Sequence, residues 1–76
     1  MTGKEWLAYF GVNLIDLLES AKMTQRDLAD ATGLSEASIS GYIRGRKMPG
    51  VKAIINIADV LNCSVSELVD FGDRIK

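Results

Sequence analysis

Apolar residues recur along the chain at intervals of three and four, the spacing that places them on one face of an α-helix. Val, Ile and Thr never alternate with polar residues for long enough to suggest a strand. The pattern therefore predicts an all-α fold. The residues expected in its core are Leu7, Phe10, Leu14, Leu18, Ala21, Leu28, Ala29, Ile39, Tyr42, Ile43, Ile54, Ile57, Ala58, Leu61, Val65 and Leu68.

Polar residues with a preference for helix ends divide this pattern into five helices. Hydroxyl side chains that can cap a helix start stand at Thr2, Thr24, Ser35 and Ser64. Three of them precede an acid by three residues, the spacing of a capping box, and Asp27 predicts a weaker box than Glu5 or Glu67. Gly33 and Asn62 tolerate the left-handed conformation that ends many helices. We predict helices over residues 3–21, 24–32, 35–43, 50–61 and 64–70.

The gaps between these helices are two to six residues long, as in one compact domain spanning residues 1–76. A chain of 76 residues without His and with one Cys lacks the commonest general base, the usual zinc ligands and an internal disulfide. We therefore expect no enzyme activity, no metal and no small-molecule cofactor. The longest purely apolar run, Trp6 to Phe10, falls far short of the ~20 residues that span a membrane. The expectation is a complete, soluble, cytoplasmic protein without a membrane partner.

Charge is distributed unevenly. The net charge is −1, but residues 44–52 hold four basic side chains and no acidic one. Such a cluster is as typical of a solvated loop as of a segment that contacts phosphate groups. Charge alone leaves both interpretations open, and the position of the cluster in the fold has to decide between them.

Residues 23–46, with the sequence MTQRDLADATGLSEASISGYIRGR, form a predicted helix, a tight turn at Gly33 and a second helix. This segment closely resembles the helix-turn-helix of phage repressor and Cro-like proteins, the XRE-type family. The stretch from Pro49 to Leu68, with ADVLNCSVSEL at its end, resembles the fourth and fifth helices of the same family. The resemblance covers residues 10–70 and implies a five-helix, lambda-repressor-like DNA-binding domain with its helix-turn-helix over residues 24–43.

In such proteins the second helix of the pair lies in the major groove, so the resemblance assigns this role to residues 35–43. On this helix Ile39 faces the core of the protein, and small residues occupy the opposite face of the helix. The DNA-binding residues that follow are Gln25, Ser35, Glu36, Ala37, Ser40, Gly41, Arg44, Arg46 and Lys47. Many family members carry long polar side chains where this chain has Ala37 and Gly41. We therefore expect modest sequence specificity, with affinity supplied by phosphate contacts and by dimerisation.

The resemblance implies a sequence-specific transcriptional regulator, a repressor that binds double-stranded DNA as a homodimer. An alternative is a protein-interaction module of the same fold, an antitoxin or adaptor, which the net negative charge and the small side chains of residues 35–43 favour. Two apolar pairs are candidates for the dimer surface: Tyr9 with Val12, and Val69 with Phe71. The second pair is preferred, because it resembles the place where related repressor domains meet.

Overall fold

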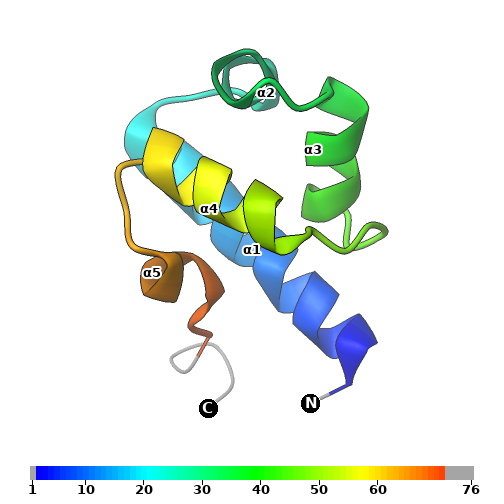
Figure 1. Cartoon of the computed structure of the whole chain (residues 1–76). Coiled ribbons are helices and arrows are strands. Elements are labelled where there is room, and N and C mark those ends of the chain that lie inside the picture. Colours follow the sequence, from blue (N-terminus) through cyan, green and yellow to red (C-terminus); the bar gives the residue numbers. More distant parts are fainter. Residues whose placement is uncertain (1, 72–76) are drawn as a thin grey trace.

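The computed structural model describes residues 2–71, which contain five α-helices and no strand. The helices are α1 (Gly3–Ala21), α2 (Gln25–Thr32), α3 (Glu36–Ile43), α4 (Val51–Val60) and α5 (Val65–Val69). The long α1 runs diagonally through the molecule, and the four shorter helices pack around it (Figure 1). The prediction of an all-α fold is confirmed. The predicted helix boundaries differ from those of the structure by at most one residue. The residues predicted to begin α2 to α5 are the N-caps of these helices.

Capping boxes begin both α1 and α2. Thr24 accepts a hydrogen bond from the Asp27 backbone N–H at 3.0 Å, and its own N–H donates to the Asp27 carboxylate at 3.0 Å. Ser64 accepts from the Glu67 N–H at 3.0 Å, but the return contact is not formed. The prediction that Asp27 makes the weakest box was wrong. The shorter Asp side chain reaches its N-cap more closely than Glu5, whose carboxylate lies 3.4 Å from the Thr2 N–H.

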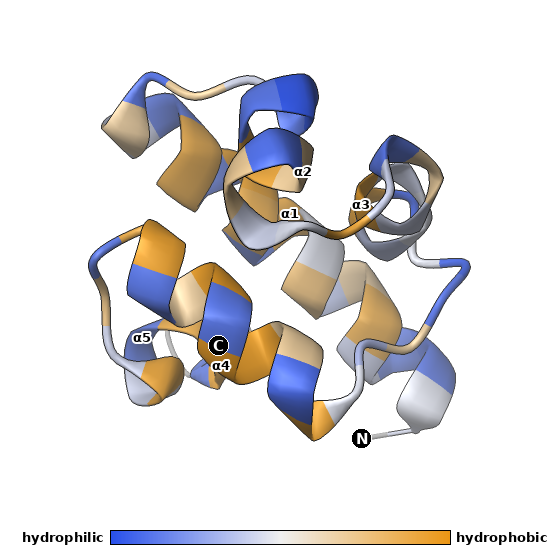
Figure 2. Ribbon diagram, turned by 45° about the horizontal axis from the view of Figure 1, so that its top comes forward, coloured by the Kyte–Doolittle hydropathy of each residue, from blue (hydrophilic) through white to orange (hydrophobic). Residues whose placement is uncertain are grey.

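The core lies where α1 meets the other four helices. Its buried residues are Phe10, Leu14, Leu18, Leu28, Ala29, Ile39, Tyr42, Ile57, Ala58, Leu68 and Phe71. Most were predicted from their spacing. Ala21 is exposed because it lies in the last turn of α1, where the chain leaves for α2, and Val65 is 41% exposed rather than buried. Hydrophobic residues, orange in Figure 2, occur along the whole of α4. Only Ile57 and Ala58 of this helix are fully buried, so α4 has further apolar residues outside its buried face.

Two asparagine side chains join helices that are distant in sequence. The Asn13 amide donates to the backbone carbonyls of Glu67 (3.0 Å) and Leu68, and thereby connects α1 to α5. The Asn56 amide donates to the carbonyl of Thr32 at 2.7 Å and connects α4 to the end of α2. Both bonds satisfy carbonyls near helix ends that have no partner within their own helix.

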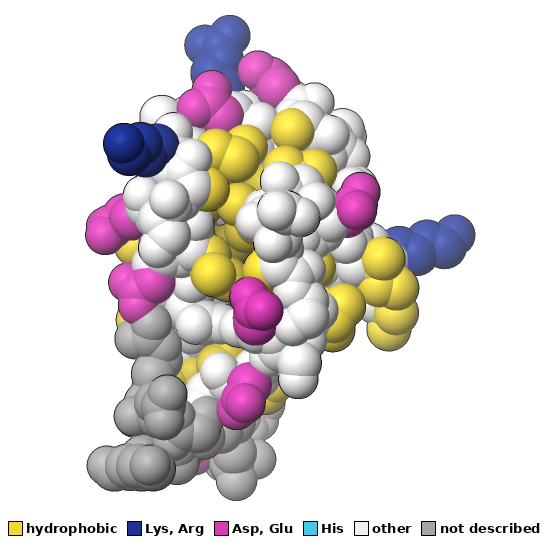
Figure 3. Space-filling view, turned by 90° about the vertical axis from the view of Figure 1, so that its left-hand side faces the viewer, with side chains coloured by type: hydrophobic (Ala, Val, Ile, Leu, Met, Phe, Trp, Pro, Cys, Tyr) yellow, Lys and Arg dark blue, Asp and Glu magenta, His cyan; other side chains and the backbone are white. Residues whose placement is uncertain are grey.

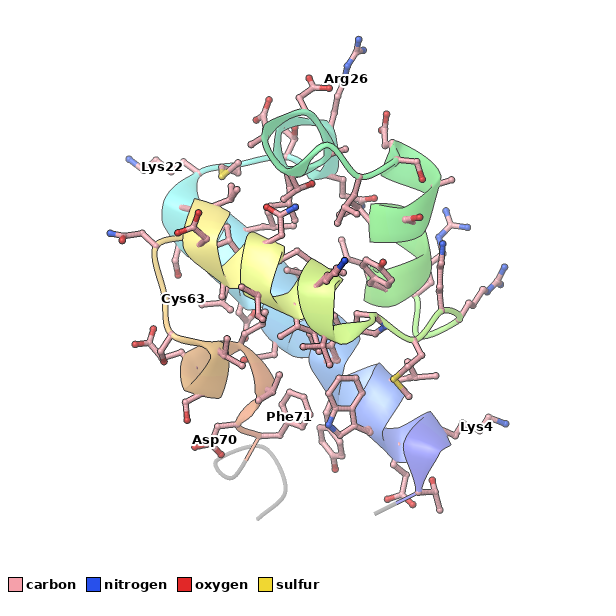
Figure 4. All side chains as sticks on the ribbon, in the orientation of Figure 1. Lys4, Lys22, Arg26, Cys63, Asp70 and Phe71 are labelled. Atoms are coloured by element: carbon pink, nitrogen blue, oxygen red, sulfur yellow. The ribbon has the colours of Figure 1, made fainter. Side chains whose placement is uncertain are left out.

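Phe71 is a core residue, which overturns one of the two predicted dimer surfaces. Its side chain is only 4% exposed, and its ring lies 5.6 Å from the ring of Trp6 and 5.9 Å from that of Tyr9. After α5 the chain turns back toward α1, and Phe71 covers the aromatic residues there (Figure 4). Val69 with Phe71 is therefore not an exposed patch. The substitution Phe71→Glu would test folding rather than dimerisation, because it buries a charge.

Gly11 determines how closely α3 approaches α1. A Cβ atom at this position would overlap the carbonyl oxygen of Ile43 and lie 3.0 Å from that of Tyr42. Because the obstacle is backbone at the end of α3, a side-chain rotation cannot make room. The close contact of α1 with α3 therefore requires a residue without a side chain at position 11.

Gly11→Ala should lower the free energy of unfolding by about 1–3 kcal/mol, the usual cost of overpacking a core, despite the better helix propensity of Ala. Urea denaturation measures the change. Gly3→Ala is the matched control, because a Cβ there meets nothing within 4 Å and the residue lies in the same helix. Equal stability of the two variants would contradict the steric role of Gly11.

Candidate nucleic-acid interface

A short turn fixes α3 relative to α2. Gly33 adopts the left-handed conformation (φ 78°), and its N–H donates to the Ala29 carbonyl at 2.9 Å. The Thr32 hydroxyl donates to the Leu28 carbonyl at 2.7 Å and accepts from the Leu34 N–H at 3.2 Å. These bonds satisfy the end of α2 and direct the chain into α3, whose first turn is capped by Ser35. The predicted turn at Gly33 and the cap at Ser35 are confirmed.

The inner face of α3 packs on α1 and α2, with Ile39 fully buried and Tyr42 4% exposed. On the outer side Glu36 and Ala37 are exposed, and Ser40 is half-buried. Gln25 is exposed at the first position of α2, and Ser35 is exposed at the N-cap of α3. Apart from Glu36, the outer side of α3 is thus made of small side chains, which would let another molecule approach its backbone closely.

Gly41 is half-buried and faces the loop that follows α3. Its carbonyl accepts from the Arg46 N–H at 2.9 Å and from the Lys47 N–H at 3.2 Å. A Cβ at position 41 would lie only 3.0 Å from the Lys47 Cβ. The close packing of this loop therefore accounts for a glycine within α3. The intramolecular contact with Lys47 gives this glycine a structural reason, and its predicted contact with DNA stays a prediction.

The loop after α3 carries basic side chains of two kinds. Arg44 and Arg46 are exposed, and neither side chain has a partner among residues 2–71. The Lys47 ammonium group, in contrast, donates to the Ser38 hydroxyl at 2.8 Å and lies 6.0 Å from the centre of the Tyr42 ring. The two arginines are available to an external anion, whereas Lys47 fastens the loop to α3.

Ser38 is a residue of this region that sequence analysis missed. Besides accepting from Lys47, its oxygen accepts from the Ser35 hydroxyl at 3.0 Å, and its N–H donates to the Ser35 oxygen at 3.0 Å. The spacing of Ser35 and Ser38 predicts the hydrogen bonds between these two residues. The contact of Ser38 with Lys47, nine residues further on, depends on the loop folding back onto α3.

Acidic side chains are spread over the face on the left of Figure 1, which Figure 3 shows directly. The helix α3 and its basic loop lie on the other side of the molecule. Arg44 and Arg46 therefore project from an acidic body at the surface where α3 is exposed. This placement favours anion contact over a merely solvated loop, because the positive charges lie next to the candidate recognition helix.

The sequence pattern of the helix-turn-helix family matches residues 7–68. The chain belongs to this helix-turn-helix family. The match includes all of α2, α3 and α4, so the resemblance to phage repressor and Cro-like proteins is confirmed.

Among known helix-turn-helix proteins, the chain is 32% identical over 60 residues to an uncharacterized HTH-type transcriptional regulator, YqaE, of Bacillus subtilis. The aligned part is 79% of this chain but 52% of that protein, so the chain spans about half the length of this relative.

Two solved structures share the helix-turn-helix fold. The restriction-modification controller protein C.AhdI from Aeromonas hydrophila superposes with a TM-score of 0.79 and 29% identity, over 82% of this chain and 94% of that one. An HTH_3 family transcriptional regulator from Vibrio cholerae superposes with a TM-score of 0.86 and 23% identity, over 97% of this chain and 42% of that one. The five-helix arrangement is therefore that of a known regulator fold.

The pKa of Asp27 is lowered from its ordinary value of 3.8, chiefly by the backbone N–H of Thr24 and next by the Thr24 hydroxyl. The folded state therefore favours the charged carboxylate, which holds the start of α2 and the exposed Gln25 in place. This stabilisation is present above pH 3.8 and is lost as the pH falls through the lowered pKa.

Asp27→Asn should consequently lower stability at neutral pH, and its difference from the unchanged protein should shrink as the pH falls below 3.8. Urea denaturation at pH 7 and at about pH 2.5 tests this window. Asp30→Asn, at an exposed position in the same helix, is the control. A stability difference that is constant with pH would show that the Asp27 charge does not act through the cap.

Proposed function

We propose that this helix-turn-helix protein is a sequence-specific DNA-binding transcriptional regulator that acts as a repressor. The observation that carries the proposal is the exposed outer side of α3, flanked by Arg44 and Arg46 without partners in the described chain. The transcriptional regulator from Bacillus subtilis and the controller protein from Aeromonas hydrophila support the same class.

Base recognition is assigned to the first turns of α3, which enter the major groove. The Ala37 methyl group is suited to contact with a thymine methyl, and the Ser40 hydroxyl can donate or accept. Glu36 can accept from a cytosine amino group, although its charge also repels phosphates. Gln25 at the start of α2 can contact a phosphate or an adenine edge. The small side chains imply a modest contribution of each contact to specificity.

Arg44 and Arg46 supply the phosphate contacts in this proposal, since both extend from the end of α3 into solvent. Lys47 contributes charge at the same place, while its bond to Ser38 keeps the loop against α3. Weak base recognition by one domain calls for a second domain on the same duplex, because two linked contacts multiply affinity. We therefore propose a homodimer that binds two half-sites, about one helical turn apart, in the cytoplasm.

No catalytic role is part of the proposal. The second candidate is a protein-interaction module of the same fold, and the acidic face opposite α3 favours it (Figure 3). The two differ in one measurable respect. A DNA-binding regulator binds duplex DNA with strong salt dependence, whereas an adaptor with its contact on the acidic face does not.

Arg44→Ala and Arg46→Ala should each reduce the slope of log affinity against log salt by about 0.9, the value for one phosphate contact. Random duplex DNA is the appropriate ligand, because phosphate contacts weaken all sequences alike. Lys22→Gln is the charge-matched control, since Lys22 lies on the side away from α3 (Figure 4). An unchanged slope in both arginine variants would refute the phosphate assignment, and no binding at low salt would refute DNA recognition altogether.

Ala37→Gln should change the preferred base at one position of each half-site, by about 1–3 kcal/mol for a well-formed bidentate contact. Selection of binding sites from a random duplex library, before and after the substitution, measures the change. Ala21→Gln, at an exposed position near the end of α1, should leave the selected site unchanged. Identical sites for the Ala37 variant, with folding intact, would show that α3 does not read bases there.

A further inference from the structure

We propose that Lys4, in the first turn of α1, is a further DNA-binding residue that contacts a phosphate group next to those bound by Arg44 and Arg46. The inference rests on the proposed function and extends the DNA-binding surface from α3 and its loop to α1. Lys4 is far from both arginines in the sequence, and only the folded chain brings the three residues to one surface.

The end of α3 and the loop after it follow one line of residues along α1. The Ile43 carbonyl lies against Gly11, where there is no room for a Cβ atom. Gly45, in the loop, lies against Ala8, since a Cβ on Gly45 would be 3.6 Å from the Ala8 Cα. Ala8 lies three residues before Gly11, and Lys4 lies four residues before Ala8. These intervals place all three on one face of α1, so Lys4 is the next residue on the line that the loop follows.

This position brings Lys4 close to the basic loop. Arg44 and Arg46 are the neighbours of Gly45 in the chain, and both are exposed. Lys4 is also exposed, one helical turn or about 6 Å along the helix axis from the contact of Gly45 with α1. Figure 4 shows the Lys4 side chain extending from α1 on the side of α3 and its loop, whereas Lys22 extends on the other side. The exposed cations thus continue the positive surface beside α3 onto α1.

The charge of Lys4 has no partner in the described part of the chain. Leu7 and Ala8, at the positions where an ion pair within the helix would form, are apolar. The neighbouring Glu5 is engaged in the capping box, where its carboxylate accepts from the Thr2 hydroxyl at 3.1 Å. The helix dipole also disfavours a cation in the first turn of a helix. Because the charge does not stabilise α1, its position favours an external anion as the partner.

The sugar-phosphate backbone of a duplex is the anion that fits this arrangement. Arg44 and Arg46 contact phosphates beside the groove that α3 enters, and further phosphates follow along the strand at about 3.4 Å of helix axis each. A separation of about 6 Å is the length of roughly two such steps. Lys4 therefore reaches a different phosphate from the two arginines. It lengthens the contacted DNA without adding sequence specificity, since phosphates carry no base information.

Lys4→Gln should reduce the slope of log affinity against log salt on random duplex DNA by about 0.9, and Lys4→Arg should keep the slope because it keeps the charge. Lys22→Gln, on the other side of the molecule, is the matched control and should leave the slope unchanged (Figure 4). Urea denaturation should find Lys4→Gln at least as stable as the unchanged chain, since the helix dipole disfavours the cation. An unchanged slope for Lys4→Gln, with reduced slopes for the arginine variants, would overturn this inference and leave the proposed function intact.

A double variant tests whether Lys4 has a phosphate of its own. Lys4→Gln/Arg46→Ala should reduce the slope by about 1.8, twice the value for one contact, because independent contacts add. A slope equal to that of Arg46→Ala alone would mean that the two side chains share one phosphate, and would overturn the separate contact.

Duplexes of decreasing length locate this phosphate. One selected half-site is placed in duplexes shortened by one base pair at a time from either end. From one end, the effect of Lys4→Gln on affinity should vanish about two base pairs before the effect of Arg46→Ala. Simultaneous loss of both effects would contradict the extended surface. An effect of Lys4→Gln only on duplexes with two half-sites would assign Lys4 to a contact between copies and overturn the inference. Absence of salt-dependent binding by the unchanged chain would refute the proposed function and this inference with it.

Discussion

The contact between Gly11 and the backbone at the end of α3 determines the position of the candidate recognition helix. Because position 11 has no side chain, the carbonyl of Ile43 can lie directly against α1. The other end of α3 is held by the short turn at Gly33. With both ends fixed to backbone rather than to flexible side chains, the outer side of α3 has one orientation relative to the core, and its exposed residues can act together.

The short helices of this chain depend on such contacts, since helices of five to ten residues are marginal in isolation. The five-residue α5 is held by the Asn13 amide at its carbonyl end and by Phe71, which packs on the aromatic rings of α1. The ten-residue α4 is joined to α2 through Asn56. Polar side chains that donate hydrogen bonds to helix-end carbonyls thus hold the short helices of this small domain in place, as a larger core does in larger proteins.

The electrostatic arrangement follows from the same geometry. Folding the loop after α3 back onto Gly41 brings Lys47 to Ser38 and leaves Arg44 and Arg46 in solvent. The charges of Arg44 and Arg46 consequently lie beside α3, and acidic side chains are scattered, together with a few basic ones, over the opposite face (Figure 3). An acidic protein can in this way present a basic surface, because the local arrangement of charges matters more for binding than their sum.

The amino-acid sequence by itself determined the five helices, their caps and most of the core, because helical spacing and hydroxyl caps act over three or four residues. It also placed the candidate site on α3 and the loop that follows it. Only the tertiary structure decided which side of each helix stays exposed and which residues distant in sequence meet. Phe71 is a core residue because the chain after α5 turns back onto α1. Gly41 packs against the loop because the loop folds over it, and Lys47 binds Ser38 because Ser38 lies within its reach. Each of these contacts depends on how the helices pack together, a property that local sequence patterns do not contain.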